Sequence, residues 1–474
     1  MDKSVKKNLA YNFAYQILAI VLPLITTPYI SRVLGPTKVG EYSYSYAIAY
    51  YFVMITMLGL NNYGNRSIAV VRDDKDELSK TFCSIYWMQL STGIISLAAY
   101  IIYGLFISNT TMTWITSLYV ISAIFDVNWF FFGMEQFKLT VTRNTFIKIF
   151  TTICIFIFVK SQEDIYLYAL IMVLGILISQ LILWQFLRKY IHFQRVEFKE
   201  VTKHIKPNLI LFIPIIAVSL YKVMDKIMLG SMTTKTEVGL YESAERIIQI
   251  PMALIQSTGT VMLPKMTNLI ANKDEKATES YFSISIMLVM FLSAPMCFGI
   301  MGVARYFVPI YYGNGYLKCI ELFQILLPSC IFLAFANVIR TQFLIPRKKD
   351  GIFISSVIIG AIVNIVINLI LIPKYESIGA AIGTLLAEIV VCVYQTILVR
   401  RDIEILRYAK DSLLFVIPAL IMYVILIIVD FKVSMIINLL THVLLGGVCY
   451  LAFLMIGLVM TKRTYLIGKI LKRG

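Results

Sequence analysis

The chain has 474 residues, of which 59% are hydrophobic and only 15% are charged. Soluble domains carry about 25% charged residues, so this composition excludes a soluble globular protein and predicts an all-α polytopic membrane protein in a lipid bilayer. The formal net charge of +16 would suit a nucleic-acid-binding protein, but basic cytoplasmic loops account for such an excess in a membrane protein, and we expect no nucleic-acid partner.

About fourteen apolar segments are long enough to cross a bilayer, which takes about 20 residues. In chain order they cover residues 9–31, 40–62, 80–106, 112–133, 143–160, 165–187, 208–230, 238–262, 280–303, 319–339, 351–372, 377–399, 411–429 and 434–460. The first segment continues to Ile30 without a site for signal cleavage, so it is predicted to be a membrane helix.

Loops rich in lysine and arginine alternate with loops that have few of them. The basic set comprises the N-terminus, the C-terminal tail and the loops at 66–80, 138–143, 188–206, 265–276, 340–349 and 400–410. Cytoplasmic loops carry this excess, so both termini are predicted to be cytoplasmic. The alternation supports the helix count, because one missed segment would reverse it.

The loops and the cysteine and histidine pattern exclude several kinds of site. The longest predicted external loop, 304–318, is too short for a catalytic domain, and the basic loop at 188–207 contains no P-loop for an ATPase. The seven cysteines form no CxxC pair and the three histidines have no metal-ligand spacing. We therefore expect neither an enzyme nor a metal site.

An internal repeat divides the predicted helices. "VGEYSYSYAI" from Val39 and "VGLYESAERI" from Val238 share spaced residues at an offset of 199, and a proline lies within each preceding helix. This pattern predicts two lobes in a parallel repeat, related by an axis along the membrane normal. The predicted parts are an N-terminal lobe at 1–190 (helices 1–6), a basic cytoplasmic linker at 191–207, a C-terminal lobe at 208–400 (helices 7–12), and helices 13–14 with a basic tail at 401–474.

Six charged residues lie inside two consecutive apolar segments. Each set is spaced i, i+3, i+4 and so shares a helix face: the first is Lys222, Asp225 and Lys226, and the second is Glu242, Glu245 and Arg246. In an antiparallel hairpin, residues equally distant from the loop lie at equal depth. Lys226 is then expected to face Glu242, with Asp225 close to Lys222 and Arg246.

This charge cluster has two interpretations. It forms either a set of ion pairs that fasten the two helices together or the wall of a hydrated cavity. An unpaired charge near mid-membrane costs about 2.5–3.5 kcal/mol on insertion scales, so the charges need partners or water. Cations held among carboxylates would also bind a phosphate group well.

Other polar residues inside predicted helices are Asp126 and Glu388, which are candidates either for structural pairing or for proton or sodium coupling. Asn364 and Asn368 are spaced i, i+4, which is typical of hydrogen bonds between membrane helices.

Five stretches stand in an order typical of one transporter family: "TPYISRVLGPTKVGEYSYSYAI", "LGLNNYGNRSIA", "NWFFFGMEQFK", "DKIMLG…VGLYESAERI" and "VMLPKMTNL". Together they resemble the polysaccharide-transporter branch of the MOP (multidrug/oligosaccharidyl-lipid/polysaccharide) superfamily, the Wzx-type flippases. The resemblance covers nearly the whole chain. It implies two six-helix lobes and a cationic cavity that passes a sugar-pyrophosphate head group while the polyprenyl tail stays in lipid.

The resemblance implies a flippase of the bacterial cytoplasmic membrane. By alternating access it would move an undecaprenyl-diphosphate-linked oligosaccharide from the inner to the outer leaflet, for capsule, O-antigen or another surface polysaccharide. Implied partners are this polyprenyl-diphosphate-linked oligosaccharide, the bilayer, and a polymerase and glycosyltransferases of the same pathway. No cofactor is implied beyond coupling to protons or sodium.

Related lipid II flippases have an acidic–arginine pair in helix 8, followed by a proline and "LLPR". Glu245–Arg246, Pro251 and "MLPK" are similar, which implies that Arg246 contacts the pyrophosphate, and Glu41 lies near an acidic position of that family. Their charged pair in helix 1 has no counterpart, because the chain carries no charge between Lys7 and Arg32. The alternatives are a lipid II flippase, a cation-coupled multidrug exporter and a membrane transferase or polymerase.

Overall fold

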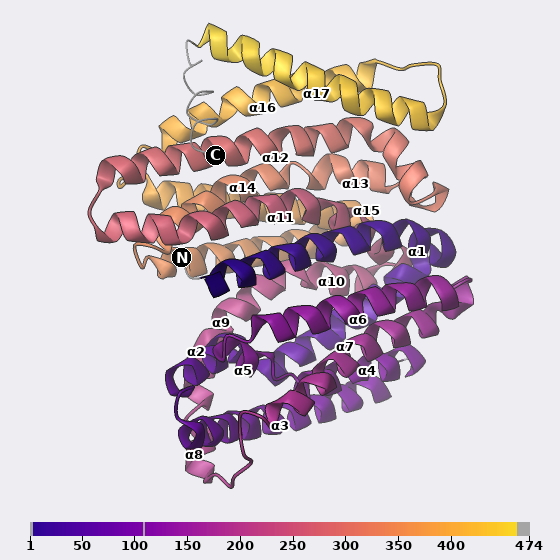
Figure 1. The fold of residues 1–474 in the computed structure, drawn as a ribbon. Coiled ribbons are helices and arrows are strands. Elements are labelled where there is room, and N and C mark those ends of the chain that lie inside the picture. Colours follow the sequence, from indigo (N-terminus) through magenta and orange to yellow (C-terminus); the bar gives the residue numbers. More distant parts are fainter. Residues whose placement is uncertain (1–2, 108–109, 462–474) are drawn as a thin grey trace. The chain divides into compact units, whose positions relative to one another are not determined.

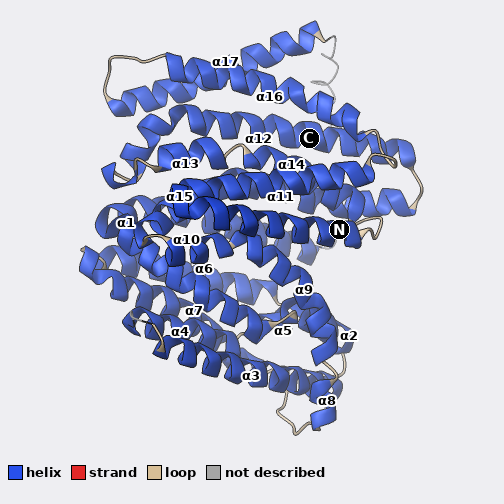
Figure 2. Cartoon of the chain, turned by 180° about the vertical axis from the view of Figure 1, so that it is seen from behind, coloured by secondary structure: helices blue, strands red, loops and turns tan. Residues whose placement is uncertain are grey.

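The computed structural model describes the backbone of residues 3–107 and 110–461, and their side chains except at 3–17, 19, 20, 110, 221 and 222. Over these residues the chain is helical, with loops and no strand (Figure 2). The predicted all-α membrane fold is therefore confirmed.

The chain forms two compact units, Met1–Ser219 and Leu220–Gly474. The long helices of the first unit are α1 (Lys3–Met57), α2 (Leu60–Val71), α3 (Lys75–Leu105), α4 (Thr110–Ile124), α6 (Phe137–Phe158), α7 (Ile165–Leu187) and α9 (Ile205–Lys222), with short helices α5 (Asn128–Gly133) and α8 (Phe198–Thr202) (Figure 1). The second unit contains α10 (Met224–Met232), α11 (Lys235–Ala271), α12 (Glu275–Tyr311), α13 (Cys319–Leu326), α14 (Ser329–Ile339), α15 (Asp350–Val399), α16 (Ile405–Ile428) and α17 (Met435–Met460). The predicted four-part division and the parallel repeat stay predictions.

Two of the helices are too long for one membrane crossing. Among the described residues, twelve helical stretches are apolar and long enough to span. With 55 residues, α1 would extend about 80 Å at about 1.5 Å per residue, against a hydrocarbon core of about 30 Å. It leaves helical geometry at Gly35 (φ 71°), and the 50-residue α15 does so at Glu376 (φ 54°). When α1 and α15 are each counted as two crossings, the twelve stretches become fourteen, which is the number of segments predicted.

Four segments predicted as single helices, 40–62, 112–133, 208–230 and 319–339, are broken in the structure, and that detail of the prediction is wrong. Two of the breaks concern candidate site residues. The predicted helix 208–230 ends at Lys222 and resumes at Met224, because Val223 departs from ideal helical angles (φ −119°). The predicted helix 112–133 is interrupted between Ile124 and Asn128. Both breaks lie beside carboxylates, Asp225 and Asp126, where an interrupted helix exposes backbone groups that can bind polar partners.

The interrupted helix of the first unit is held by tight packing. Trp129 on α5 stacks on Phe82 of α3 with ring centroids 5.5 Å apart, and its indole N–H donates to Gln89 Oε1 at 3.0 Å. A Cβ on Gly64 of α2 would lie 2.6 Å from the Trp129 ring, so only glycine allows α2 and α5 to approach this closely. This packing fixes the side chains of α2 and α5 that line a pocket described below.

In the second unit, α16 and α17 pack beside α12 (Figure 1). Gly302 of α12 and Gly446 of α17 both lie against Leu426 of α16, and Arg305 donates from Nη2 to the carbonyl of Val429 at 2.6 Å. The two C-terminal helices are thus integral to this unit.

Candidate functional site

Four charged side chains meet between α10 and α11 in the second unit. Lys226 Nζ lies 2.6 Å from Glu242 Oε2 and 2.8 Å from Glu245 Oε2. Arg246 Nε lies 2.9 Å from the other Glu242 oxygen, Oε1. Lys226 therefore faces Glu242, as the depth argument predicts, whereas the role of these residues in substrate binding stays a prediction.

The two cations of this cluster differ in their surroundings. The Lys226 side chain contacts two carboxylates and is 17% exposed, whereas Arg246 is 31% exposed. Since Glu242 bridges the two cations, it holds Arg246 in place at the more open side of the cluster. The side chain of Lys222, the third predicted cation, lies outside the described residues.

Asp225 does not join these ion pairs among the described side chains, and its predicted place close to Lys222 and Arg246 stays a prediction. It is 1% exposed and accepts hydrogen bonds from Tyr241 at 2.6 Å, Thr384 at 2.7 Å and Asn368 Nδ2 at 2.6 Å. The prediction treated this stretch as one continuous helix, whereas α10 begins only after the break at Val223.

The Asp225 site brings α10, α11 and both segments of α15 together. Asn368 precedes the break at Glu376 and Thr384 follows it. All three donors to the carboxylate are neutral, so the site is a buried carboxylate surrounded by hydroxyl and amide groups. The spacing of Asn364 and Asn368 indicated a bond between helices, and Asn368 does form one, but nothing in the sequence showed that its partner is Asp225, 143 residues away.

Two further candidate residues are Glu41 and Glu388. Glu41 belongs to the first unit, where its carboxylate lies 2.9 Å from Lys38 Nζ. Glu388 is 5% exposed and lines a small cavity of about 50 Å³ together with Asn337, Arg340 and Gln395. Their predicted roles in substrate binding and coupling stay predictions.

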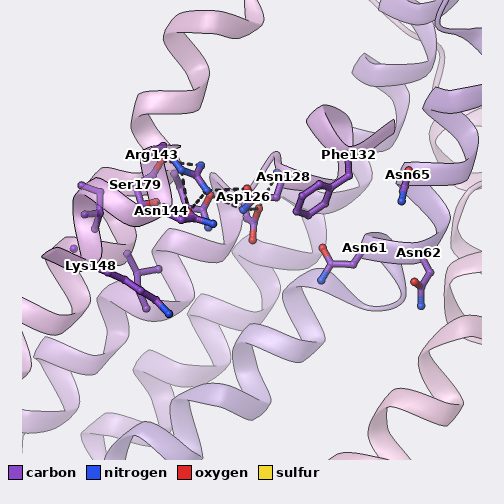
Figure 3. Close-up of a pocket in the computed structure, with 14 residues that line it drawn as sticks. Asn61, Asn62, Asn65, Asp126, Asn128, Phe132, Arg143, Asn144, Lys148 and Ser179 are labelled. Atoms are coloured by element: carbon purple, nitrogen blue, oxygen red, sulfur yellow. Dashed lines mark hydrogen bonds between the residues drawn. The ribbon is translucent and has the colours of Figure 1, made fainter. Parts of the chain in front are cut away.

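Asp126 lines a larger pocket of about 590 Å³ that lies wholly within the first unit (Figure 3). One of its oxygens, Oδ1, accepts from the backbone N–H and the side-chain amide of Asn128, at 2.9 and 2.7 Å. The sequence pointed to Asp126 but did not show the amides around it. Apart from Asn128, they come from α2, α6 and α7, and only the fold brings them together.

A second ion-pair group links the first turn of α11 and the break in α15 with the loop before α13. Lys318 Nζ lies 2.7 Å from Glu237 and 2.6 Å from Glu376. Burial by itself lowers the pKa of Lys318, but its hydrogen bonds to these two carboxylates outweigh this effect and raise the pKa above its ordinary value. The group holds the carboxylate of Glu376, the residue at which α15 is interrupted, and sequence inspection missed it.

Comparison with known proteins assigns the chain to a family. Residues 5–270, more than half of the chain, match the family described as "Polysaccharide biosynthesis protein". The chain belongs to this family. It is a member of the polysaccharide-transporter branch of the MOP superfamily, as the order of its motifs indicated.

Two relatives align with more than four-fifths of this polysaccharide transporter and over nearly their own whole length. A protein of Escherichia coli K12 named "Putative O-antigen transporter" is 22% identical over 84% of the chain and 97% of its own length. "Capsular polysaccharide biosynthesis protein CapF" of Staphylococcus aureus is 23% identical over 81% of the chain and 96% of its own length.

Solved structures show the same fold. The lipid II flippase MurJ in an inward closed conformation superposes with a TM-score of 0.77 at 16% identity, covering 96% of this transporter and all of MurJ. An inward-facing multidrug transporter of the MATE family gives a TM-score of 0.57 at 13% identity, covering 81% and 95% of the two chains. At these identities the likeness concerns the fold alone.

Proposed function

We propose that this polysaccharide transporter is a flippase for an undecaprenyl-diphosphate-linked oligosaccharide. It moves the repeat unit from the inner to the outer leaflet of the bacterial cytoplasmic membrane by alternating access, with both termini in the cytoplasm. Glycosyltransferases of the same pathway supply its substrate, and a polymerase of that pathway uses its product. It transports and performs no chemistry on the sugar.

The observation that carries this proposal is the position of Arg246 in a chain that belongs to the polysaccharide-transporter family. Its relatives are named for O-antigen and capsule, which are polymers built from saccharide units. Arg246 is a partly exposed cation within a membrane-spanning helix, held from one side by Glu242. A guanidinium can bind a phosphate through two parallel hydrogen bonds, and a membrane interior offers few other groups that compensate a pyrophosphate charge.

The two interpretations of the charge cluster then apply to different residues. Lys226, which contacts two glutamates, fastens α10 to α11. Arg246 contacts the pyrophosphate. Glu242 serves both functions, because one of its oxygens holds Lys226 and the other orients Arg246.

Coupling to a proton or a monovalent cation is proposed at Asp225. A buried carboxylate without a cationic partner is costly in its charged form, and Asp225 has only neutral partners among the described side chains. Protonation, or a bound monovalent cation coordinated by the same oxygens, removes this cost. Asp126 and Glu388 remain the other candidates from the sequence.

A lipid II flippase is the second candidate. Two proteins named lipid II flippase MurJ, from Rickettsia prowazekii and Bacillus subtilis, match 30% and 33% of the chain. The sequence "MLPK" and the Glu245–Arg246 pair favour this reading, whereas the absence of charges between Lys7 and Arg32 opposes it.

Deletion of the gene tests the proposal. Lipid-linked oligosaccharides should accumulate in the cytoplasmic leaflet, surface polysaccharide should be lost, and lipid II should still reach the outer leaflet. Lipid II accumulation would instead support the second candidate. Normal surface polysaccharide in the deletion strain would refute both.

A further inference from the structure

The pocket of the first unit is built around a buried arginine. Arg143 on α6 is 6% exposed, and its guanidinium donates to Asn128 Oδ1, to Asn144 Oδ1 and to the carbonyl of Ser179. Asn128 in turn donates to Asp126 and to Gln180 Oε1. Arg143 thus ties α5, α6 and α7 together, and these three acceptors are neutral oxygens. The guanidinium has a positioning role in the wall of the pocket.

This network leaves several polar atoms available at the pocket. Gln180 is 8% exposed and uses only Oε1, so its Nε2 donates to no described residue. Among the described residues, the side chain of Asn144 forms hydrogen bonds only through Oδ1. The Asp126 carboxylate likewise accepts hydrogen bonds only through Oδ1. Two amide donors and one carboxylate acceptor therefore line the pocket without a protein partner among the described side chains.

A further group of amides that lines the pocket comes from α2. Asn61, Asn62 and Asn65 line the pocket, and none of the three side chains has a hydrogen bond within the described part of the chain. The opposite face of α2, with Leu60, Gly64 and Ile68, is buried. The packing of Gly64 against Trp129 fixes α2 so that its asparagines face the pocket.

We propose that this pocket binds the sugar part of the transported lipid, a site that rests on the proposed function but is separate from the charge cluster. Amides both donate and accept hydrogen bonds, as neighbouring hydroxyl groups on a sugar ring do. Phe132, which also lines the pocket, supplies an aromatic face for the apolar side of a ring. The volume of about 590 Å³ lies within the range of about 300–1,000 Å³ found for small-molecule pockets.

The other ligand classes fit the pocket less well. A pyrophosphate would face the Asp126 carboxylate, and the Arg143 guanidinium is already engaged with Asn128, Asn144 and Ser179. An organic cation would meet Arg143 and Lys148, which line the same pocket. A neutral ligand with many hydroxyl groups uses both the free donors and the free acceptor.

The test measures binding of two lipids to the purified full-length protein in detergent. The first is the polyprenyl-diphosphate saccharide fraction extracted from the protein's native cells, and the second is undecaprenyl diphosphate without sugar. The variant is Asn61→Ala/Asn62→Ala/Asn65→Ala, because these side chains form no hydrogen bond with the described residues whose loss would disturb folding. The matched control is Asn272→Ala, which removes an exposed amide that donates to Asn268.

The wild-type protein and Asn272→Ala should bind the saccharide lipid about tenfold more tightly than the bare lipid, and the triple variant should lose most of this preference while binding the bare lipid as before. Arg246→Ala should weaken binding of both lipids by similar factors.

A triple variant that keeps the preference would overturn the sugar site and leave the asparagines as a solvated helix face. A wild-type protein that binds the bare lipid but shows no preference would also overturn it. Failure of the wild-type protein to bind either lipid would overturn the proposed function, and the sugar site with it.

Discussion

Glu242 holds two cations through different oxygens, and this arrangement decides how each cation can act. Lys226 is shared by Glu242 and Glu245, so its charge is compensated within the protein. Arg246 has Glu242 on one side and is the most exposed of the four residues. Loss of Lys226 should therefore affect stability, and loss of Arg246 should affect transport.

Removal of one partner of the Lys226–Glu242 pair should destabilise the protein. Breaking a buried ion pair costs about 3–5 kcal/mol, and we expect the lower end because these side chains are about one-sixth exposed. The amount of folded Lys226→Ala in the membrane should fall. The amount of folded Glu242→Ala should also fall, and this substitution should displace Arg246 as well, because it removes the carboxylate that holds it. The double variant should recover folded protein relative to either single variant; a double variant no more abundant than the singles would show that the pair does not fasten α10 to α11.

Substitution of Asp225 by asparagine should uncouple transport from its driving ion. The change preserves shape but removes the group that can take up a proton or bind a cation, so transport should become insensitive to a proton or sodium gradient. Measurement of transport in proteoliposomes with each gradient imposed separately checks this. Asp126→Asn and Glu388→Gln serve as comparisons. If Asp225→Asn still depends on the gradient and one of these two variants does not, the coupling site lies at the residue changed in that variant.

At the level of helices, apolar run length and loop charge predicted much of the fold. Polar residues around Gly35 and Glu376 marked the breaks that divide α1 and α15, so both were predicted as pairs of segments. The break at Val223 was not predicted, because a β-branched residue by itself carries no signal for a helix end and the spacing of the flanking charges fitted one helix face. The hydrogen-bond partners of Asp225 come from distant parts of the chain, so the sequence did not show them either.

The contact between α2 and α5 should be sensitive to one added methyl group. A Cβ at Gly64 would lie 2.6 Å from the buried Trp129 ring, which has little room to move. Overpacking of this kind costs about 1–3 kcal/mol, so Gly64→Ala should lower the thermal unfolding temperature. Gly447→Ala on α17 is the control, because a Cβ there meets nothing within 4 Å. Equal unfolding temperatures for the two variants would contradict the close packing of α2 on Trp129.

For the whole molecule, the charges of the loops predict the orientation in the membrane. A cysteine placed at Lys235, the first residue of α11, should react with a membrane-impermeant maleimide added outside intact cells. A cysteine at Arg195, in the basic loop before α8, should react only after the membrane is opened. Labelling at Arg195 from outside would reverse the orientation.

Family membership and the overall fold followed from the sequence, whereas the geometry of both sites did not. Motif order pointed to the transporter branch, and the spacing of Lys226 and Glu242 around their loop predicted that they meet. Apart from Asn128, the amides around Asp126 lie on α2, α6 and α7, and no spacing rule relates Asn62 to Gln180. Contacts of this kind depend on packing at single residues such as Gly64.

The most direct measurement of the central claim is flipping of purified polyprenyl-diphosphate oligosaccharide in proteoliposomes that contain equal amounts of wild-type or variant protein. Arg246→Ala should fold normally and lose at least about tenfold in flipping rate, corresponding to about 1.4 kcal/mol or more. Arg246→Lys should be partly active, because lysine keeps the charge but lacks the planar fork. If Arg246→Ala flips the lipid at the wild-type rate per molecule, Arg246 does not bind the pyrophosphate and the charge cluster only fastens the helices together.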